Sequence, residues 1–218
     1  MQPAAFVFDA YGTLFDVHSA AARYADALGE RWLTLSELWR TKQLEYTWVR
    51  TLAGKHCSFW QVTEDGLDYA SAAVGGIDSD LRGRLLDSYR KLAAYPEVPE
   101  CLKALKARGS VVVILSNGDP DMLVDAVNSA GLEDAFDAVL SVAEVGVYKP
   151  NHQVYELATA RLGVSPTQVS FQSSNRWDIA GAKSFGFRTV WINRAGRPDE
   201  YLDLAADEVL NDLNGLLR

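Results

Sequence analysis

The segment Phe6-Val-Phe-Asp-Ala-Tyr-Gly-Thr-Leu-Phe15 decides how this chain is organised. Its first three residues, Phe6 to Phe8, are apolar and typical of a short buried strand, and Gly12 allows the tight turn that follows. Asp9 then falls at the carboxyl end of a central strand, which is the edge where open α/β sheets bind ligands. Taken alone, Asp9 fits a helix or turn cap about as well as a catalytic carboxylate.

The composition is that of a globular protein with a substantial core. The chain has 218 residues, enough for one domain or two small ones, and 48% of them are hydrophobic. A net charge of −8 without a basic tract argues against nucleic acid or a membrane surface as a partner. The sequence contains neither a signal peptide nor an apolar run of membrane length, so we expect a soluble cytoplasmic protein.

Cysteine and histidine are too sparse to suggest a metal centre or a disulfide framework. The two cysteines, Cys57 and Cys101, lie among helical patterns, and the three histidines are scattered along the chain. We therefore expect neither a metal ion nor another cofactor.

Residues 16–95 are rich in helix-forming Ala, Leu, Arg and Glu and have almost no strand signal. Capping residues and glycines divide them into four expected helices. These cover residues 19–29, Ser36 (as N-cap) to residue 52, residues 60–73, and a segment that starts after Asp78 or Ser79. We expect a helical cap domain, residues 16–95, inserted into a core formed by residues 1–15 and 96–218.

From residue 96 onward, amphipathic helical patterns alternate with short apolar runs. The runs predict four further strands, at residues 111–115, 138–142, 169–172 and 189–192. Strict alternation of strands and helices favours a parallel sheet with helices on both faces. The predicted fold class is therefore α/β, with a Rossmann-like core and a helical cap.

A cluster of polar residues follows each of the first four predicted strands. The clusters are Asp9 and Thr13, then Ser116 and Asn117, then Lys149, and finally Ser173, Asn175 and Asp178. Each cluster alone is explained more simply by turns, caps or a solvated lysine. Parallel strands, however, end at the same edge of the sheet, so the whole set is expected to converge there.

Five segments resemble successive signatures of the L-2-haloacid dehalogenases, a branch of the haloacid dehalogenase superfamily. They are Phe-Asp-Ala-Tyr-Gly-Thr-Leu-Phe-Asp (8–16), Leu-Trp-Arg-Thr-Lys-Gln-Leu-Glu-Tyr-Thr-Trp (38–48), Ile-Leu-Ser-Asn-Gly (114–118), Val-Tyr-Lys-Pro (147–150) and Ser-Ser-Asn-Arg-Trp-Asp (173–178). Trp-Ile-Asn-Arg at 191–194 extends the match, so the resemblance covers nearly the whole chain.

The resemblance implies that Asp9 displaces the halide at C2 of a short 2-haloacid and forms an ester, which water then hydrolyses. The product would be a 2-hydroxy acid inverted at C2, and covalent catalysis would divide one hard displacement into two steps. Tyr11 stands where the phosphatases of the superfamily carry a second Asp as acid/base. A departing halide needs no proton, so the absence of that acid suits a metal-free dehalogenase.

The resemblance also assigns roles to the other polar residues. It implies that Lys149 keeps Asp9 ionised and that Arg40 accepts the departing halide, assisted by Asn117. Ser116, together with backbone N–H groups after Asp9, would hold the substrate carboxylate. From the residues alone, Arg40 is also explained as an exposed helix arginine, and Lys149 as one half of a structural salt bridge.

The remaining predicted catalytic residues would orient Asp9, Lys149 and the hydrolytic water, and they are Thr13, Tyr155, Ser173, Asn175 and Asp178. Asp178 is the residue we expect to activate the water. Packing in the core explains Tyr155 about as well as a catalytic role does. Substrate contacts are further expected from the residues that would form the pocket walls, which are Ala10, Tyr11, Phe59 and Trp177.

Two positions depart from the family pattern, because Ala10 and Gln172 stand where larger or apolar residues are expected. Two other functions remain open from sequence: a Mg²⁺-dependent phosphatase of the same superfamily and a non-catalytic binding protein on the same fold. The expected partners are a small 2-haloacid, the halide ion and a second copy of the chain in a homodimer.

Overall fold

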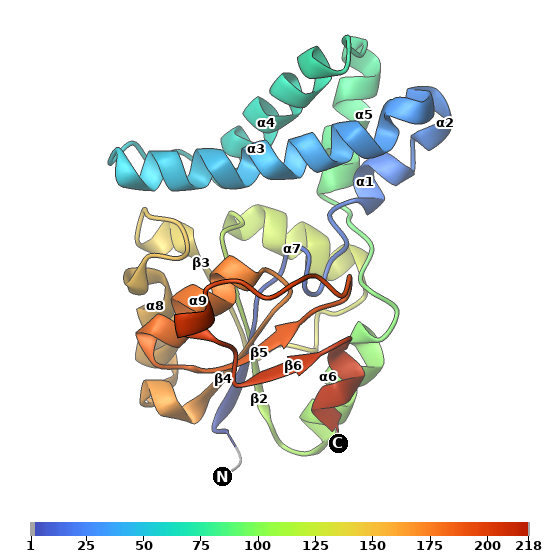
Figure 1. Cartoon of the computed structure of the whole chain (residues 1–218). Helices are drawn as coiled ribbons and strands as arrows, with labels where there is room; N and C mark the ends of the chain where they lie inside the picture. Colours follow the sequence, from blue (N-terminus) through green and yellow to red (C-terminus); the bar gives the residue numbers. More distant parts are fainter. Residues whose placement is uncertain (1–2, 218) are drawn as a thin grey trace.

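The computed structural model describes residues 3–217. Six parallel strands form one sheet in the order β3-β2-β1-β4-β5-β6 (Figure 1). In chain order the strands are β1 (Ala5–Phe8), β2 (Val111–Ser116), β3 (Ala138–Ser141), β4 (Val169–Ser173), β5 (Arg188–Ile192) and β6 (Glu208–Leu210). The predicted parallel α/β fold is thereby confirmed.

β1 is central because all four of its side chains are buried, which requires neighbours on both edges and cover on both faces. Phe8, its last residue, lies opposite Ile114 of β2 and Gln172 of β4. The strand order reverses between β1 and β4, and Asp9 follows directly at this switch point. The fold therefore directs Asp9 to the place where such sheets bind ligands.

Four helices cover the two faces of the sheet. They are α6 (Val98–Ala107), α7 (Pro120–Ser129), α8 (His152–Leu162) and α9 (Arg176–Phe185). Right-handed crossovers carry α6 and α7 over one face, and they carry α8 and α9 over the other after the strand order reverses.

Five helices form a separate layer above the carboxyl edge of the sheet (Figure 1). They are α1 (Ser19–Ala22), α2 (Ala25–Leu28), α3 (Trp32–Leu52), α4 (Phe59–Ala73) and α5 (Ser79–Tyr89). The two chain segments that join this layer to the sheet run side by side. The Asp16 N–H donates to Ala93 O at 2.8 Å and the Tyr95 N–H to Leu14 O at 3.0 Å. We propose that this layer is the cap domain, residues 16–95.

Parts of the predicted cap are wrong in detail. The single helix expected at residues 19–29 is two four-residue helices, because Tyr24 leaves helical geometry with φ −117° and ψ 24°. α3 begins at Trp32 rather than after Ser36, which is buried inside the helix and bonds through Oγ to His18 Nδ1 at 2.8 Å. β6, a three-residue edge strand, was not predicted.

No helix among residues 3–217 combines the length and the apolar character needed to cross a membrane.

The packing of α6 on the sheet predicts a sharp contrast between two neighbouring positions. Leu102 is fully buried, so Leu102→Ala leaves a cavity and should lower the free energy of unfolding by about 2–5 kcal/mol. Lys103 is exposed, and Lys103→Ala should change that free energy by less than about 0.5 kcal/mol. Urea denaturation of the two variants measures the contrast. Equal effects would contradict this account of the core.

Candidate active site

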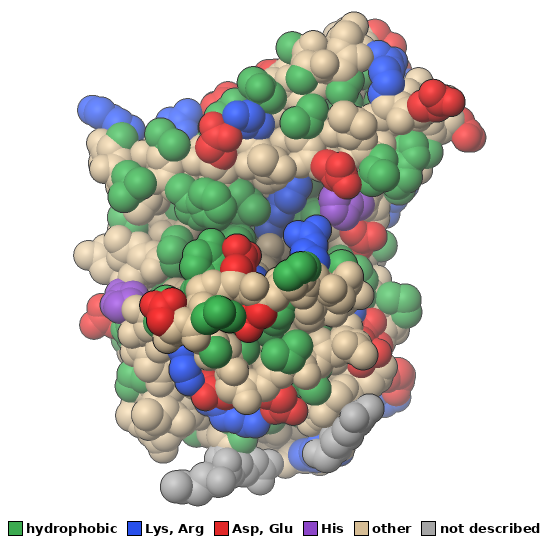
Figure 2. Space-filling view, in the orientation of Figure 1, with side chains coloured by type: hydrophobic (Ala, Val, Ile, Leu, Met, Phe, Trp, Pro, Cys, Tyr) green, Lys and Arg blue, Asp and Glu red, His purple; other side chains and the backbone are tan. Residues whose placement is uncertain are grey.

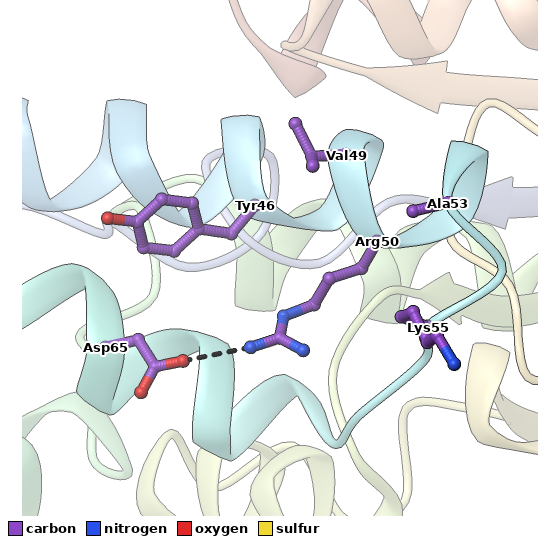
Figure 3. Close-up of a pocket in the computed structure, with 6 residues that line it drawn as sticks. All are labelled: Tyr46, Val49, Arg50, Ala53, Lys55 and Asp65. Atoms are coloured by element: carbon purple, nitrogen blue, oxygen red, sulfur yellow. Dashed lines mark hydrogen bonds and ion pairs between the residues drawn. The ribbon is translucent and has the colours of Figure 1, made fainter.

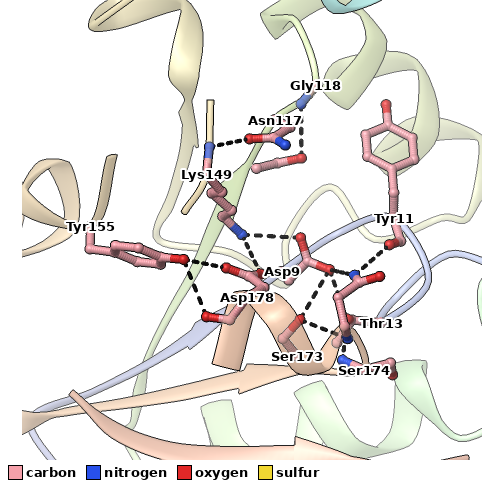
Figure 4. A network of polar contacts seen from close by, with 12 residues as sticks. Asp9, Tyr11, Thr13, Asn117, Gly118, Lys149, Tyr155, Ser173, Ser174 and Asp178 are labelled. Carbon is pink, nitrogen blue, oxygen red and sulfur yellow. Dashed lines mark hydrogen bonds and ion pairs between the residues drawn. The ribbon is translucent and has the colours of Figure 1, made fainter. Parts of the chain in front are cut away.

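The carboxylate of Asp9 is the centre of a dense polar network at the carboxyl edge of the sheet (Figure 4). Its Oδ1 accepts a hydrogen bond from Lys149 Nζ at 3.1 Å. Its Oδ2 accepts bonds from Thr13 Oγ1 and Asn175 Nδ2, both at 2.8 Å, and a longer one from Ser173 Oγ at 3.5 Å. Only 7% of the Asp9 side chain is exposed, so these donors take the place of water around a nearly dry carboxylate.

The ammonium of Lys149 lies between two carboxylates. Its side chain is fully buried, and Nζ is 3.1 Å from Asp9 Oδ1 and 2.9 Å from Asp178 Oδ2. Burial alone would lower the pKa of Lys149, but the charges of Asp178 and Asp9 outweigh it and raise that pKa above its ordinary value. Lys149 therefore stays charged and holds the two acids together. It is not a solvated loop lysine.

Asp178 is fully buried, and both of its carboxylate oxygens are engaged. Oδ2 pairs with Lys149, and Oδ1 accepts a hydrogen bond from the Tyr155 hydroxyl at 2.8 Å. Burial raises the pKa of Asp178 from 3.8 to about 6, although the positive charge of Lys149 opposes the rise. Asp178 can therefore exchange a proton near neutral pH.

Tyr155 both packs in the core and contacts the polar network, so each interpretation of its sequence position has a structural counterpart. Its ring packs among Phe171, Phe185 and Phe187, with centroids 5.8–6.0 Å away. Burial raises the pKa of Tyr155 well above its ordinary value, so its hydroxyl stays protonated and donates to Asp178.

Arg40 reaches the site from α3 in the layer above. Its Nη2 donates to Tyr11 O at 3.1 Å and to Asn175 Oδ1 at 3.3 Å, and its Nη1 donates to Gln43 Oε1 at 3.1 Å. Within residues 3–217, no salt bridge involves Arg40, and Glu37, three residues earlier on the same helix, does not pair with it. A guanidinium held only by neutral acceptors keeps its charge available for an anion.

Ser116 and Asn117, at the end of β2, are buried beside this network. Ser116 Oγ accepts the Gly118 N–H at 3.0 Å, and Asn117 Oδ1 accepts the Lys149 N–H at 3.0 Å. In the described chain, the Asn117 side-chain NH₂ and the backbone N–H groups of Ala10 and Tyr11 make no hydrogen bond. These groups are donors for a negatively charged ligand.

Aromatic side chains line the site toward the cap. Tyr11 is 2% exposed, stacks on Tyr89 with ring centroids 5.8 Å apart and packs against Phe59 at 5.5 Å. Trp177 packs edge-on against Trp48 at 5.6 Å, beside a pocket of about 580 Å³ that Lys149 also lines. Figure 2 shows a hollow between the helical layer and the sheet, with Lys or Arg side chains among hydrophobic ones.

The two residues that depart from the family pattern do not disturb the network. Ala10 is fully buried, and its carbonyl accepts the N–H groups of Leu14 and Phe15 in the turn after Asp9. The amide of Gln172 donates to Ser170 Oγ at 2.6 Å, while its buried Oε1 has no partner in the described chain.

A second surface pocket, of about 470 Å³, lies between α3 and α4 (Figure 3). An Arg50–Asp65 ion pair of 3.2 Å crosses it. None of its lining residues was predicted to belong to the site, and none belongs to the network around Asp9. Hence this pocket is separate from the network around Asp9.

Three residues that the sequence did not single out also support the site. Gln43 bonds Arg40, one helical turn along α3, a spacing that the sequence could have revealed. Arg194 Nη2 donates to Thr13 O at 2.9 Å. Asp119 accepts the N–H groups of Phe59 and Trp60, at 3.1 and 2.8 Å, and so ties α4 to the loop after β2.

A buried carboxylate, paired with a lysine at the switch point of a Rossmann-like sheet, is an arrangement typical of an enzyme active site. The sequence model of the haloacid dehalogenase-like hydrolase family matches residues 3–186. (S)-2-haloacid dehalogenase 1 of Pseudomonas sp. (strain CBS-3) is 50% identical over 198 residues, which cover 90% of this chain and 87% of that protein. The chain therefore belongs to the haloacid dehalogenase-like hydrolase family, among its (S)-2-haloacid dehalogenases.

Solved structures agree with this assignment. A crystal structure of a dehalogenase with an intermediate complex superposes with a TM-score of 0.97 at 45% identity, over 99% of this chain and 96% of that chain. The L-2-haloacid dehalogenase from Xanthobacter autotrophicus with chloropropionic acid covalently bound superposes with a TM-score of 0.88 at 37% identity, over 99% and 97% of the two chains.

The Tyr155–Asp178 hydrogen bond predicts a change in proton affinity. Tyr155→Phe removes a donor that favours the ionised carboxylate, so it should raise the pKa of Asp178 further above about 6. Carbon-13 NMR titration of the aspartate carboxyls measures this pKa. Tyr148→Phe is the matched control, because the Tyr148 hydroxyl donates to Cys57 O and does not contact Asp178. A pKa that stays the same in Tyr155→Phe would contradict the prediction.

Proposed function

We propose that this protein hydrolyses short L-2-haloacids to D-2-hydroxy acids, with inversion at C2, through an ester on Asp9 and without a metal ion. The observation that carries the proposal is the arrangement of two groups. The Asn175 amide links a nearly dry carboxylate, Asp9, to a guanidinium, Arg40, that has no carboxylate partner among residues 3–217. The activity in the names of the similar proteins supports the substrate class, and the chloropropionic acid bound covalently in the Xanthobacter structure supports a covalent intermediate.

In the first proposed step, an Asp9 oxygen donates an electron pair to C2 while the C2–halide bond breaks and the halide departs with its electrons. Attack from the side opposite the halide inverts C2. Charge moves from Asp9 to the departing halide, so the cation of Arg40 and the Asn117 NH₂ stabilise the transition state more than the ground state. Lys149 keeps Asp9 ionised before the attack.

The substrate carboxylate needs its own donors during this step. The Ser116 hydroxyl and the backbone N–H groups of Ala10 and Tyr11 are suited to this role because their hydrogens have no acceptor in the described chain. The apolar ring of Tyr11, with Phe59 behind it, limits water around the alkyl group and so strengthens these electrostatic contacts.

In the second proposed step, water attacks the ester carbonyl of Asp9 and gives up one proton. The bond between the Asp9 carbonyl carbon and the ester oxygen then breaks, the departing alkoxide takes the second proton of the water to become the 2-hydroxy acid, and the Asp9 carboxylate is restored. We propose that Asp178 accepts the proton of the attacking water, because a pKa of about 6 leaves it mostly ionised at neutral pH while keeping it basic. Thr13, Ser173 and Asn175 hold the Asp9 carboxyl in place through both steps.

No observation favours the two other functions. The position of the second phosphatase carboxylate is filled by Tyr11, whose ring lies in the aromatic wall. The family membership stated above contradicts the non-catalytic alternative. A homodimer and a cytoplasmic location stay predictions. The exposed apolar residues Val49 and Leu52 on α3 support a test of self-association by analytical ultracentrifugation.

The proposal predicts halide release from L-2-chloropropionate, with D-lactate as the product and with full activity in EDTA. Asp9→Asn removes the nucleophile and should lower the rate by about 10⁴-fold or more. The D enantiomer and the Asp9→Asn variant are the controls. A folded protein that releases no halide from either enantiomer, or that needs an added metal ion, would overturn the proposal.

A further inference from the structure

Among residues 3–217, the side chain of Gln43 is the one hydrogen-bond acceptor that Arg40 finds in its own helical layer. Nη1 of the guanidinium donates to Gln43 Oε1 at 3.1 Å, whereas Nη2 turns toward Tyr11 O and Asn175 Oδ1 below. Gln43 is fully buried, although glutamine is a residue type usually found at the surface. A buried amide needs partners for both of its ends, so its environment constrains which way it points.

The hydrogen bonds around Gln43 allow only one orientation of its amide. The Thr63 hydroxyl donates its single proton to Phe59 O at 2.7 Å, so Thr63 Oγ1 must accept from Gln43 Nε2 at 2.8 Å. Oε1 therefore faces the opposite way and accepts from Arg40 and, at 3.0 Å, from the Tyr89 hydroxyl. The side-chain amide of Gln43 on α3 is thus held from two neighbouring helices, by Thr63 of α4 at its nitrogen and by Tyr89 of α5 at its oxygen.

Gln43 Oε1 belongs to an uncharged amide, and this matters for an arginine that is proposed to bind an anion. A carboxylate at this position would hold the guanidinium equally well but would pair with its charge and weaken its attraction for a halide. An amide fixes the direction of the guanidinium and leaves the positive charge uncompensated.

We propose that Gln43 is a positioning residue that orients the Arg40 guanidinium toward the departing halide. The inference rests on the proposed role of Arg40 in accepting that halide. It goes beyond that role because it explains how the helical layer holds Arg40 over a site built on the sheet. Thr63 belongs to the same series of hydrogen bonds, because it fixes the orientation of the Gln43 amide.

The leaving-group dependence of the reaction tests this inference. The quantity kcat/KM covers the steps up to cleavage of the carbon–halide bond, and chloride needs more assistance in leaving than bromide does. Gln43→Leu should lower kcat/KM for L-2-chloropropionate on the order of tenfold, the effect of losing a hydrogen bond to a charged group. The loss for L-2-bromopropionate should be smaller, so the chloro-to-bromo ratio falls.

A second pair of variants keeps the test decisive if Gln43→Leu does not fold. Thr63→Val removes the acceptor that fixes the Gln43 amide and should lower the same ratio by a smaller factor. Thr47→Val is the matched control, because Thr47 is equally buried on α3 and its hydroxyl, within residues 3–217, bonds only to Leu44 O of its own helix. Its ratio should equal that of the unmodified enzyme.

Gln43→Glu separates orientation from charge. It retains an acceptor for Arg40 but adds a carboxylate, so inhibition by added chloride should weaken relative to the unmodified enzyme. A ratio unchanged in both Gln43→Leu and Thr63→Val, or equal losses for the two substrates, would overturn the positioning role. Absence of halide release from the unmodified enzyme would instead overturn the proposed function itself.

Discussion

The buried ammonium of Lys149 between Asp9 and Asp178 is the interaction on which the rest of the site depends. Charges inside a protein are tolerated only when they are paired and hydrogen-bonded, and removing one partner of such a group costs about 3–5 kcal/mol. Lys149 lies within 3.1 Å of both carboxylates. The other oxygen of Asp9 accepts bonds from Thr13 and Asn175, and the other oxygen of Asp178 accepts one from Tyr155. Therefore the three charges hold segments from three parts of the chain together.

The sheet supplies this network because its strands are parallel. Asp9 follows β1, Lys149 lies in the loop after β3, and Asp178 lies in the first turn of α9 after β4. Their strands end at one edge, so residues separated by 140 positions, such as Asp9 and Lys149, meet within a hydrogen bond. The switch point between β1 and β4 leaves room above Asp9 for a ligand.

The helical layer contributes a different kind of group. The chain carries a net charge of −8, yet Arg40 and several unpaired N–H donors make the site locally attractive to an anion. Arg40 is held by backbone and amide oxygens. One of these is Oε1 of Gln43, and the buried hydrogen bond between Gln43 and Thr63 determines which way that oxygen points. In the proposed mechanism, this division between two layers lets the sheet hold the nucleophile while the helices hold the cation for the departing group.

The sequence by itself determined the strands β1 to β5, their order along the chain and the polar residues at the ends of the first four, because apolar runs and turn residues are local signals. It determined the chemical class through Asp9, Lys149 and Asp178 together with their motifs. Only the tertiary structure decided the break between α1 and α2, the burial of Ser36 and the pairing of the short edge strand β6. It also showed that the Tyr155 ring packs among core aromatic rings while its hydroxyl donates to Asp178, and that Arg40 has no carboxylate partner among residues 3–217. It further revealed the orientation of Gln43. Those outcomes depend on contacts between residues that are distant in the chain. The pKa of Asp178 also depends on the tertiary structure, because burial raises it.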